Sequence, residues 1–127
     1  MSDKSISQRL FIKTGYRMAL INAPDNFIDQ MGNLPEKVII TRSVGKTTNI
    51  VQAFVDSKEK LIDFLDNLYK ENKELIIWIA YPKGTSKVKT DINRDIISKI
   101  AQENYSMKSV AMISIDEKWS SIRFKLI

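Results

Sequence analysis

The stretch ELIIWIA, Glu74 to Ala80, decides the fold class, because every side chain after Glu74 is apolar. An almost continuously apolar run of this length is typical of a strand that is buried on both faces of a sheet. Such strands lie at the centre of α/β domains, where other elements cover both faces of the sheet. We therefore predict that this stretch is the central strand.

Five further runs have the composition of strands. They are Arg17–Asn22, Lys37–Arg42, Asn49–Val55, Ser109–Ile115 and Ser121–Leu126. The last run alternates apolar and polar side chains, which predicts a strand with one buried face. The short link DEKW before it favours an antiparallel hairpin of the last two strands.

The last strand also offers an edge to which a second chain could add, although Arg123 and Lys125 oppose such pairing. The oligomeric state stays open.

Helical periodicity fills the gaps between these runs. Apolar residues recur at helical spacing in Lys58–Asn72 and Ile92–Tyr105, and a shorter helix is expected at Asn26–Met31. The expected N-caps are Asp56 or Ser57 for the first helix and Thr90 or Asp91 for the second, and Gly32 is expected to end the third. The order of elements predicts a single α/β domain over residues 1–127, with a mostly parallel sheet flanked by helices and a C-terminal antiparallel hairpin.

The composition excludes several classes of chemistry. The chain has neither histidine nor cysteine, so it has no imidazole base, no thiolate nucleophile and no thiolate metal ligand. We expect no metal and no cofactor. The N-terminus lacks an apolar stretch typical of a signal peptide, and no apolar run is long enough to span a membrane, so we expect a cytoplasmic protein. The net charge of +5 is concentrated in residues 1–20 and 81–127.

The densest cluster of polar residues is AYPKGTSKVKTD, Ala80 to Asp91, directly after the central strand. In open α/β sheets, ligands bind beyond the carboxyl ends of the strands. The lysines and hydroxyl groups of this loop therefore make it either an anion site or a solvated polar loop with a helix cap. Asn22, the last residue of the first predicted strand, is expected at the same edge, together with Ser43 and Asp56.

Two nucleotide-binding motifs are absent. SVGKTT, Ser43 to Thr48, lacks the first glycine of a P-loop, since Ile40 stands in that place, and a strand follows it instead of a helix. NAPDNF, Asn22 to Phe27, stands where a dinucleotide or methyl-donor fold has its glycine-rich turn, but it contains no glycine.

Two blocks of the chain resemble a widespread bacterial domain family of unknown function. Its pattern "(W/Y)PK-x-(S/T)-S-x-(V/I)-x-TD" is matched from Tyr81 to Asp91, and "(V/I)D-x-x-WS-x-(L/I)-(K/R)-(F/L)" is matched from Ile115 to Phe124. The resemblance implies a trimmed Rossmann or methyltransferase-like core that ends in a hairpin. It implies no activity, and the missing methyl-donor turn means that no methyl-donor cofactor is carried over.

The two blocks supply most of the candidate site residues. If the hairpin lies beside the central strand, Asp116 or Asp91 is expected to pair with Lys83, and Trp119 is expected to pack over the loop. This arrangement is either a structural latch or a site for a small anion or metabolite. The full candidate set is Asn22, Lys83, Thr85, Ser86, Thr90, Asp91, Asp116 and Trp119.

Three functions remain open from the sequence. The favoured one is a non-enzymatic module that binds a small anionic ligand at the loop of residues 80–91. One alternative is an enzyme that uses Lys83 and Asp91 at the carboxyl edge of the strands. The other alternative is a protein- or nucleic-acid-interaction domain with basic termini. Nucleic acid is the less favoured of these partners, because most aromatic residues fall at predicted core positions.

Overall fold

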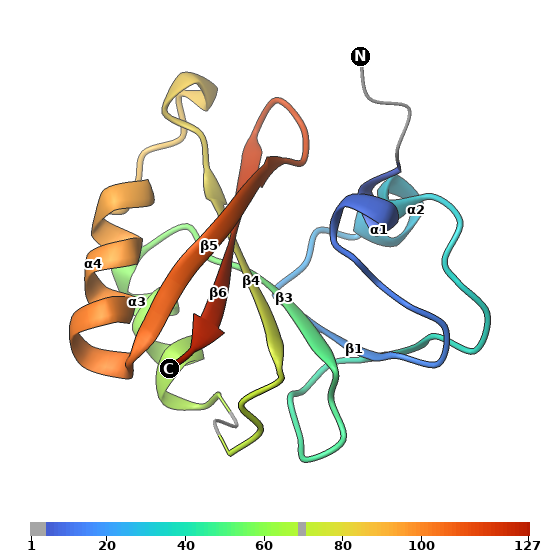
Figure 1. Cartoon of the computed structure of the whole chain (residues 1–127). Coiled ribbons are helices and arrows are strands. Elements are labelled where there is room, and N and C mark those ends of the chain that lie inside the picture. Colours follow the sequence, from blue (N-terminus) through green and yellow to red (C-terminus); the bar gives the residue numbers. More distant parts are fainter. Residues whose placement is uncertain (1–4, 69–70) are drawn as a thin grey trace.

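The computed structural model describes residues 5–68 and 71–127, which form a six-stranded sheet with helices on both sides (Figure 1). The strand order is β2-β1-β3-β4-β6-β5. The strands are β1 (Arg17–Ile21), β2 (Ile39–Thr41), β3 (Ile50–Phe54), β4 (Ile76–Pro82), β5 (Met107–Ser114) and β6 (Trp119–Leu126). The helices are α1 (Ile6–Arg9), α2 (Phe27–Met31), α3 (Lys58–Asp66), the 3-10 turn η1 (Gly84–Ser86) and α4 (Arg94–Tyr105).

The sheet is mixed, and this corrects the predicted fold class. β1 is parallel to β2 and β3, and β3 is parallel to β4. β6 is antiparallel to both β4 and β5, and β5 and β6 are the longest strands, with eight residues each. The prediction of a mostly parallel sheet of Rossmann or methyltransferase type is therefore wrong.

The helical cover is also thinner than predicted. Parallel strands are usually joined by a crossover that contains a helix, but residues 42–49 join β2 to β3 without one. α1 and α2 have only four and five residues. The expected helices flanking the sheet are thus reduced to α3 and α4 on one face and two short turns of helix on the other.

The predicted C-terminal hairpin is present. The backbone N–H of Ile115 donates to the carbonyl oxygen of Trp119 at 3.0 Å and closes the turn. β6 lies between β4 and β5, so it is not an edge strand. The exposed edge that the sequence suggested at Ser121–Leu126 belongs instead to β5.

The central strand is buried as predicted. From Ile77 to Pro82, every residue of β4 is buried. Its side chains alternate between two apolar clusters, as expected for a strand with both faces covered. We name the two sides of the sheet by what covers them: the helical face under α3 and α4, and the N-terminal face under α1, α2 and the segment Leu10–Tyr16.

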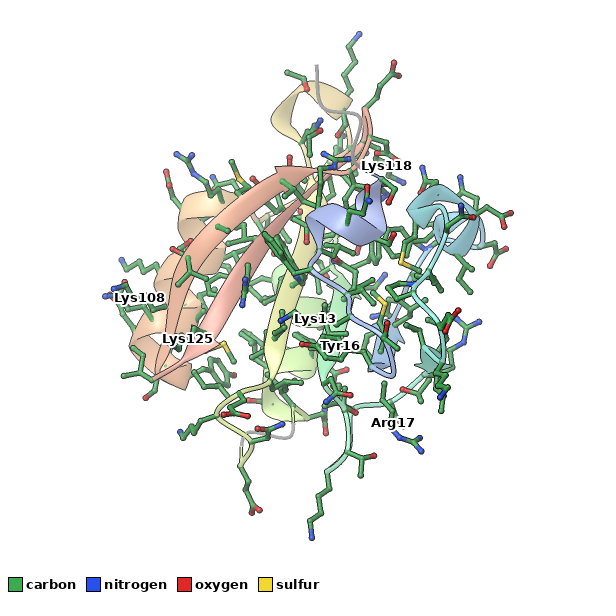
Figure 2. All side chains as sticks on the ribbon, turned by 45° about the vertical axis from the view of Figure 1, so that its right-hand side comes forward. Lys13, Tyr16, Arg17, Lys108, Lys118 and Lys125 are labelled. Atoms are coloured by element: carbon green, nitrogen blue, oxygen red, sulfur yellow. The ribbon has the colours of Figure 1, made fainter. Side chains whose placement is uncertain are left out.

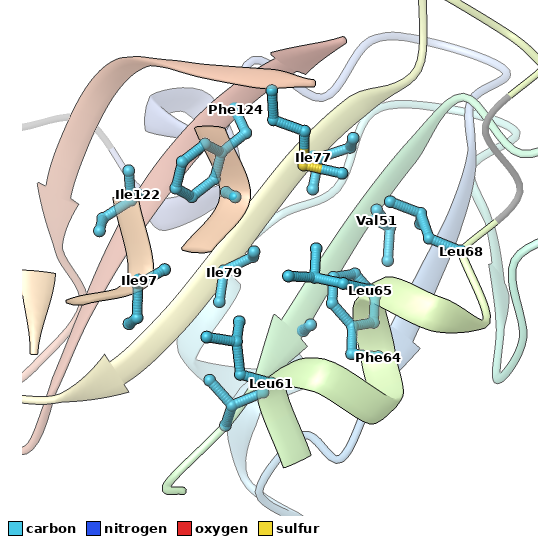
Figure 3. Close-up of a cluster of buried hydrophobic side chains, with 14 of the residues drawn as sticks. Val51, Leu61, Phe64, Leu65, Leu68, Ile77, Ile79, Ile97, Ile122 and Phe124 are labelled. Carbon is cyan, nitrogen blue, oxygen red and sulfur yellow. The ribbon is translucent and has the colours of Figure 1, made fainter. Parts of the chain in front are cut away.

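The helical face holds the larger cluster (Figure 3). Leu61, Phe64 and Leu65 of α3 and Ile97 of α4 pack on Val51, Ile77, Ile79, Ile122 and Phe124 of the sheet. The cluster of the N-terminal face contains Trp78, which is fully buried and donates its indole N–H to the carbonyl oxygen of Leu10 at 3.3 Å. Trp78 is therefore a core residue, as predicted.

A buried polar pair crosses the sheet on the N-terminal face. The side-chain amide of Gln52 on β3 donates to the hydroxyl of Ser121 on β6 at 3.0 Å, and both residues are fully buried. Buried polar groups are costly unless they are hydrogen bonded, so each of these side chains requires the other. Neither strand pattern predicted this pair.

The boundaries of both longer helices differ from the prediction: α3 ends at Asp66 instead of Asn72, and α4 begins at Arg94 instead of Ile92. Residues 69–70 of the predicted range of α3 lie outside the described residues. The N-cap of α3 is Ser57, one of the two residues expected there, and its hydroxyl accepts the backbone N–H of Lys60. α4 is capped by Asn93, not by Thr90 or Asp91. α1, which the sequence analysis missed, has a reciprocal capping box of Ser5 and Gln8. In the described ranges 5–68 and 71–127, no helix has the length and apolarity required to cross a membrane.

Candidate functional site

The Lys83 loop, residues 83–91, is fastened to the hairpin at its start. The backbone N–H of Lys83 donates to the carbonyl oxygen of Lys118 at 2.8 Å, which extends the β4–β6 pairing by one step. The Lys83 ammonium donates to the hydroxyl of Ser114 at 2.5 Å. Ser114 ends β5, and its carbonyl oxygen also accepts the guanidinium of Arg9 at 2.9 Å. Lys83 is therefore held at the hairpin by Ser114, whereas the sequence led us to expect Asp116 or Asp91 as its partner.

The middle of the loop is a single 3-10 turn. The hydroxyl of Ser86 donates to the carbonyl oxygen of Lys83 at 2.6 Å, and the N–H of Ser86 donates to the same oxygen at 3.0 Å. Thr85 is exposed, and Lys87 has a left-handed backbone with φ of 62°. The turn thus holds the Thr85 hydroxyl at the surface.

The end of the loop contacts the N-terminus of α3, whereas the sequence indicated that it would cap the helix that follows the loop. A carboxylate oxygen of Asp91 accepts the backbone N–H of Lys58, the first residue of α3, at 2.7 Å. The hydroxyl of Thr90 donates to the carbonyl oxygen of Asp56 at 2.7 Å and accepts the N–H of Ile92 at 3.3 Å. A negative carboxylate is stabilising at a helix N-terminus. Thr90 and Asp91 therefore fix the start of α3, where they are not directed at Lys83.

Asp116 organises the hairpin turn. One of its carboxylate oxygens accepts the N–H groups of Lys118 and Trp119, each at 2.8 Å, and the other accepts the side-chain amide of Gln30 at 3.0 Å. Burial raises the pKa of Asp116, but these hydrogen bonds and the charge of Lys83 outweigh it and lower the pKa below its ordinary value. Among the described residues, the ion pairs are Lys60–Asp56 and Arg94–Asp95, so Lys83 acts on Asp116 through space without a direct pair.

Trp119 packs toward the sheet. It lies opposite Pro82 in the β4–β6 register, and its ring meets the ring of Phe54 edge to face with centroids 5.1 Å apart. The Lys118 ammonium lies 5.1 Å from the centroid of the Trp119 ring. The expected packing of Trp119 over the loop is thus a contact with the end of β4 and with β3.

Asn22 is separated from the rest of the candidate set. It follows β1, is exposed and has a left-handed backbone with φ of 58°. β3 lies between β1 and β4 in the sheet, which places the ends of β1 and β4 about 10 Å apart.

A hollow of about 180 Å³ adjoins the end of β1 and is lined by Ile21, Arg42, Ser43 and the side of α3. Ser43 therefore lines a different hollow from the Lys83 loop.

A hollow lies between the Lys83 loop and the hairpin turn, and we call it the loop hollow. It has a volume of about 390 Å³ and is lined by Thr85, Ser86, Val88, Glu117 and Lys118. Thr85 and Ser86 belong to the predicted set. Glu117 and Lys118 were not singled out, although they stand inside the second sequence block. The signal that points to them is the hairpin itself, because it brings the two blocks together.

Two tyrosines, like Asp116, have shifted pKa values. Burial raises the pKa of Tyr81, and a hydrogen bond of 2.6 Å to Asp66 raises the pKa of Tyr105 to about 12. Both shifts, like that of Asp116, move the group away from neutral pH. Within residues 5–68 and 71–127, no cluster of three or more carboxylates could hold a metal ion.

Neither a protein-family model nor a curated protein matches the chain. The resemblance of its two blocks to a bacterial domain family therefore stays a prediction.

Proposed function

We propose that this protein is a non-enzymatic, cytoplasmic bacterial module that binds a small anionic ligand in the loop hollow. The observation that carries the proposal is the meeting of the two sequence blocks around this hollow, where Thr85 and Ser86 of the first block and Lys118 of the second line one surface. Its volume of about 390 Å³ falls within the range of small-molecule sites.

The charges around the hollow support an anion that also carries hydrogen-bond donors. Lys83, Lys87 and Lys89 belong to the adjoining loop, and Lys118 lines the hollow itself. Glu117 is the acidic residue in the lining. A ligand that carries a phosphate or carboxylate together with hydroxyl or amino groups would satisfy both Lys118 and Glu117.

The enzyme alternative receives less support from the geometry. Lys83 donates to Ser114, and Asp91 accepts the first N–H of α3. Both groups are thus occupied by structural partners, whereas a general acid or base must reach the proton that it transfers. Neither residue is in the lining of the loop hollow.

The test is a ligand-induced shift in melting temperature. Wild-type protein is heated with inorganic phosphate, pyrophosphate and glycerol phosphate, against chloride at matched ionic strength. We expect at least one of these probes to raise the Tm, because a ligand that binds only the folded state stabilises it. In Thr85→Val/Lys118→Gln the rise should disappear.

The matched control is Lys99→Gln, which removes the same charge from an exposed position on α4. It should keep the full rise. The proposal fails if none of the three anions shifts the wild-type Tm, or if the double variant responds as the wild type does.

A further inference from the structure

The N-terminal face of the sheet is exposed on the part of the hairpin away from its turn, where Lys108 and Lys125 are exposed and Arg123 is partly exposed. Ile122, Phe124 and Leu126 point into the cluster of the helical face, so the alternate residues Arg123 and Lys125 point to the opposite side. Lys108 stands opposite Lys125 in the β5–β6 register and shares its face. We call the surface of Lys108, Val110, Arg123 and Lys125, with Phe11 at its border, the basic hairpin face.

The basic hairpin face carries uncompensated positive charge. Like charges directly opposite each other on neighbouring strands are destabilising, yet Lys108 faces Lys125. In the described part of the chain, none of the cations of this face takes part in an ion pair. A hollow of about 300 Å³ adjoins this face. Its lining contains three basic residues, Lys73, Arg123 and Lys125, and one acidic residue, Glu74. In Figure 2, Lys108, Lys125, Lys13 and Arg17 follow one another across the view.

Phe11 adds an exposed aromatic ring at a strained position. It follows the end of α1, where the N–H of Phe11 donates to the carbonyl oxygen of Gln8 and the N–H of Ile12 donates to that of Ser7. This arrangement is a Schellman motif, in which glycine usually occupies the left-handed position. Phe11 occupies it with φ of 64° and 52% of its surface exposed. Phe11 belongs to neither of the two buried clusters.

The guanidinium of Arg123 completes the surface. It lies 5.6 Å from the centroid of the Phe11 ring. Arg123 and Lys125 are two residues apart on one strand, so their Cα atoms lie about 6.7 Å apart. This separation is comparable with the distance between successive phosphates of an extended single strand. Phe11 lies outside the sheet, in the turn after α1, and borders the cations of β5 and β6. An exposed aromatic ring beside cations is the kind of surface on which the bases of single-stranded nucleic acid stack.

We propose that the basic hairpin face binds single-stranded nucleic acid, with Phe11 stacking on a base and with Lys108, Arg123 and Lys125 contacting the backbone phosphates. A duplex hides its bases from a surface ring, whereas a single strand exposes them. This site goes beyond the loop hollow, and it uses none of the residues that line that hollow.

The test is fluorescence anisotropy with labelled twelve-nucleotide dT and rU oligomers at several salt concentrations. We expect wild-type binding that weakens as salt rises, because phosphate contacts release counterions. Lys108→Gln/Lys125→Gln should weaken binding and flatten its salt dependence. Lys58→Gln/Lys99→Gln removes the same charge from exposed positions on the two helices of the opposite face, and it should bind as wild type does.

Phe11→Gly separates recognition from folding. Glycine suits the left-handed position, so the Tm should be unchanged or raised, while the affinity for the oligomers should fall roughly fivefold or more as stacking is lost. A variant that binds normally would overturn the role of Phe11. The proposal as a whole is overturned by absence of binding at low salt, or by equal binding of a matched duplex or of polyglutamate.

The two proposals fail separately. Thr85→Val/Lys118→Gln should bind the oligomers as the wild type does. A loss of oligomer binding in that variant would place the nucleic acid at the loop hollow and overturn the assignment to the hairpin face.

Discussion

The carboxylate of Asp116 joins parts of the chain that are distant in sequence. It accepts two N–H groups of its own turn and the side-chain amide of Gln30 on α2, and it lies in the field of Lys83. The sequence predicted a pair of Asp116 with Lys83, but the structure shows only the charge of Lys83 acting on Asp116 without a direct ion pair. Their neighbours Ser114 and Gln30 were not identified, because a hydrogen-bond partner on another element leaves no periodic signal. The Gln52–Ser121 pair and the exposure of Phe11 were missed for the same reason.

Asp116→Asn should lower stability at neutral pH and reduce its acid sensitivity. The folded-state pKa of Asp116 is below the ordinary value of an aspartate carboxyl, so its contribution is present above about pH 4 and is lost as pH falls through the folded-state value. Asparagine keeps an acceptor for the turn but loses the charge, and we expect a cost of about 1 kcal/mol after solvent screening. Urea unfolding at pH 7 and pH 3 measures it.

The difference between Asp116→Asn and wild type should narrow between pH 7 and pH 3, because the stability contributed by a carboxyl with a lowered folded-state pKa is lost as pH falls below its ordinary pKa toward the folded-state value. Glu117→Gln, the same change at the exposed neighbouring position, should leave stability unchanged at both pH values. A constant difference between pH 7 and pH 3 would show that the charge of Asp116 does not contribute.

At the scale of elements, periodicity located the structure well, and caps were harder to assign. The buried central strand and the final hairpin lie where the apolar pattern placed them. α3 begins at Lys58 as predicted but ends at Asp66, short of the predicted Asn72, and α4 begins at Arg94 instead of Ile92. Thr90 and Asp91 have the residue types of N-caps, and the sequence assigned them to the following helix. In the structure they serve α3 instead. A sequence shows which residues can cap a helix, but which helix they cap depends here on how α3 packs against α4.

Asp91→Ala should destabilise the protein through α3. The substitution leaves the N–H of Lys58 without its acceptor and removes a negative charge from the start of the helix. The expected loss is about 1 kcal/mol in the free energy of unfolding, measured by urea denaturation. Asp91→Asn keeps an oxygen acceptor, so it should cost clearly less. Equal losses in the two variants would show that the hydrogen bond to Lys58 carries no stability.

For the whole molecule, the sequence could not fix strand direction. Apolar runs predict that strands exist and how deeply they are buried, but the same run fits a parallel or an antiparallel partner. Direction follows from the connections. The link at residues 42–49 crosses without a helix, and the hairpin turn inserts β6 beside β4. The mixed sheet and its thin helical cover follow from these two connections, neither of which has an apolar period.

The two clusters of the core should unfold together, because β3 and β4 supply both. Trp78 and Trp119 belong to the N-terminal face, whereas the two longer helices cover the helical face. Tryptophan fluorescence and far-ultraviolet circular dichroism therefore report on opposite faces, and their urea midpoints should coincide. Leu65→Ala removes a fully buried side chain of α3 at a cost of about 2–5 kcal/mol. It should lower both midpoints equally, and a fluorescence midpoint that stays at the wild-type value would show that each face unfolds independently.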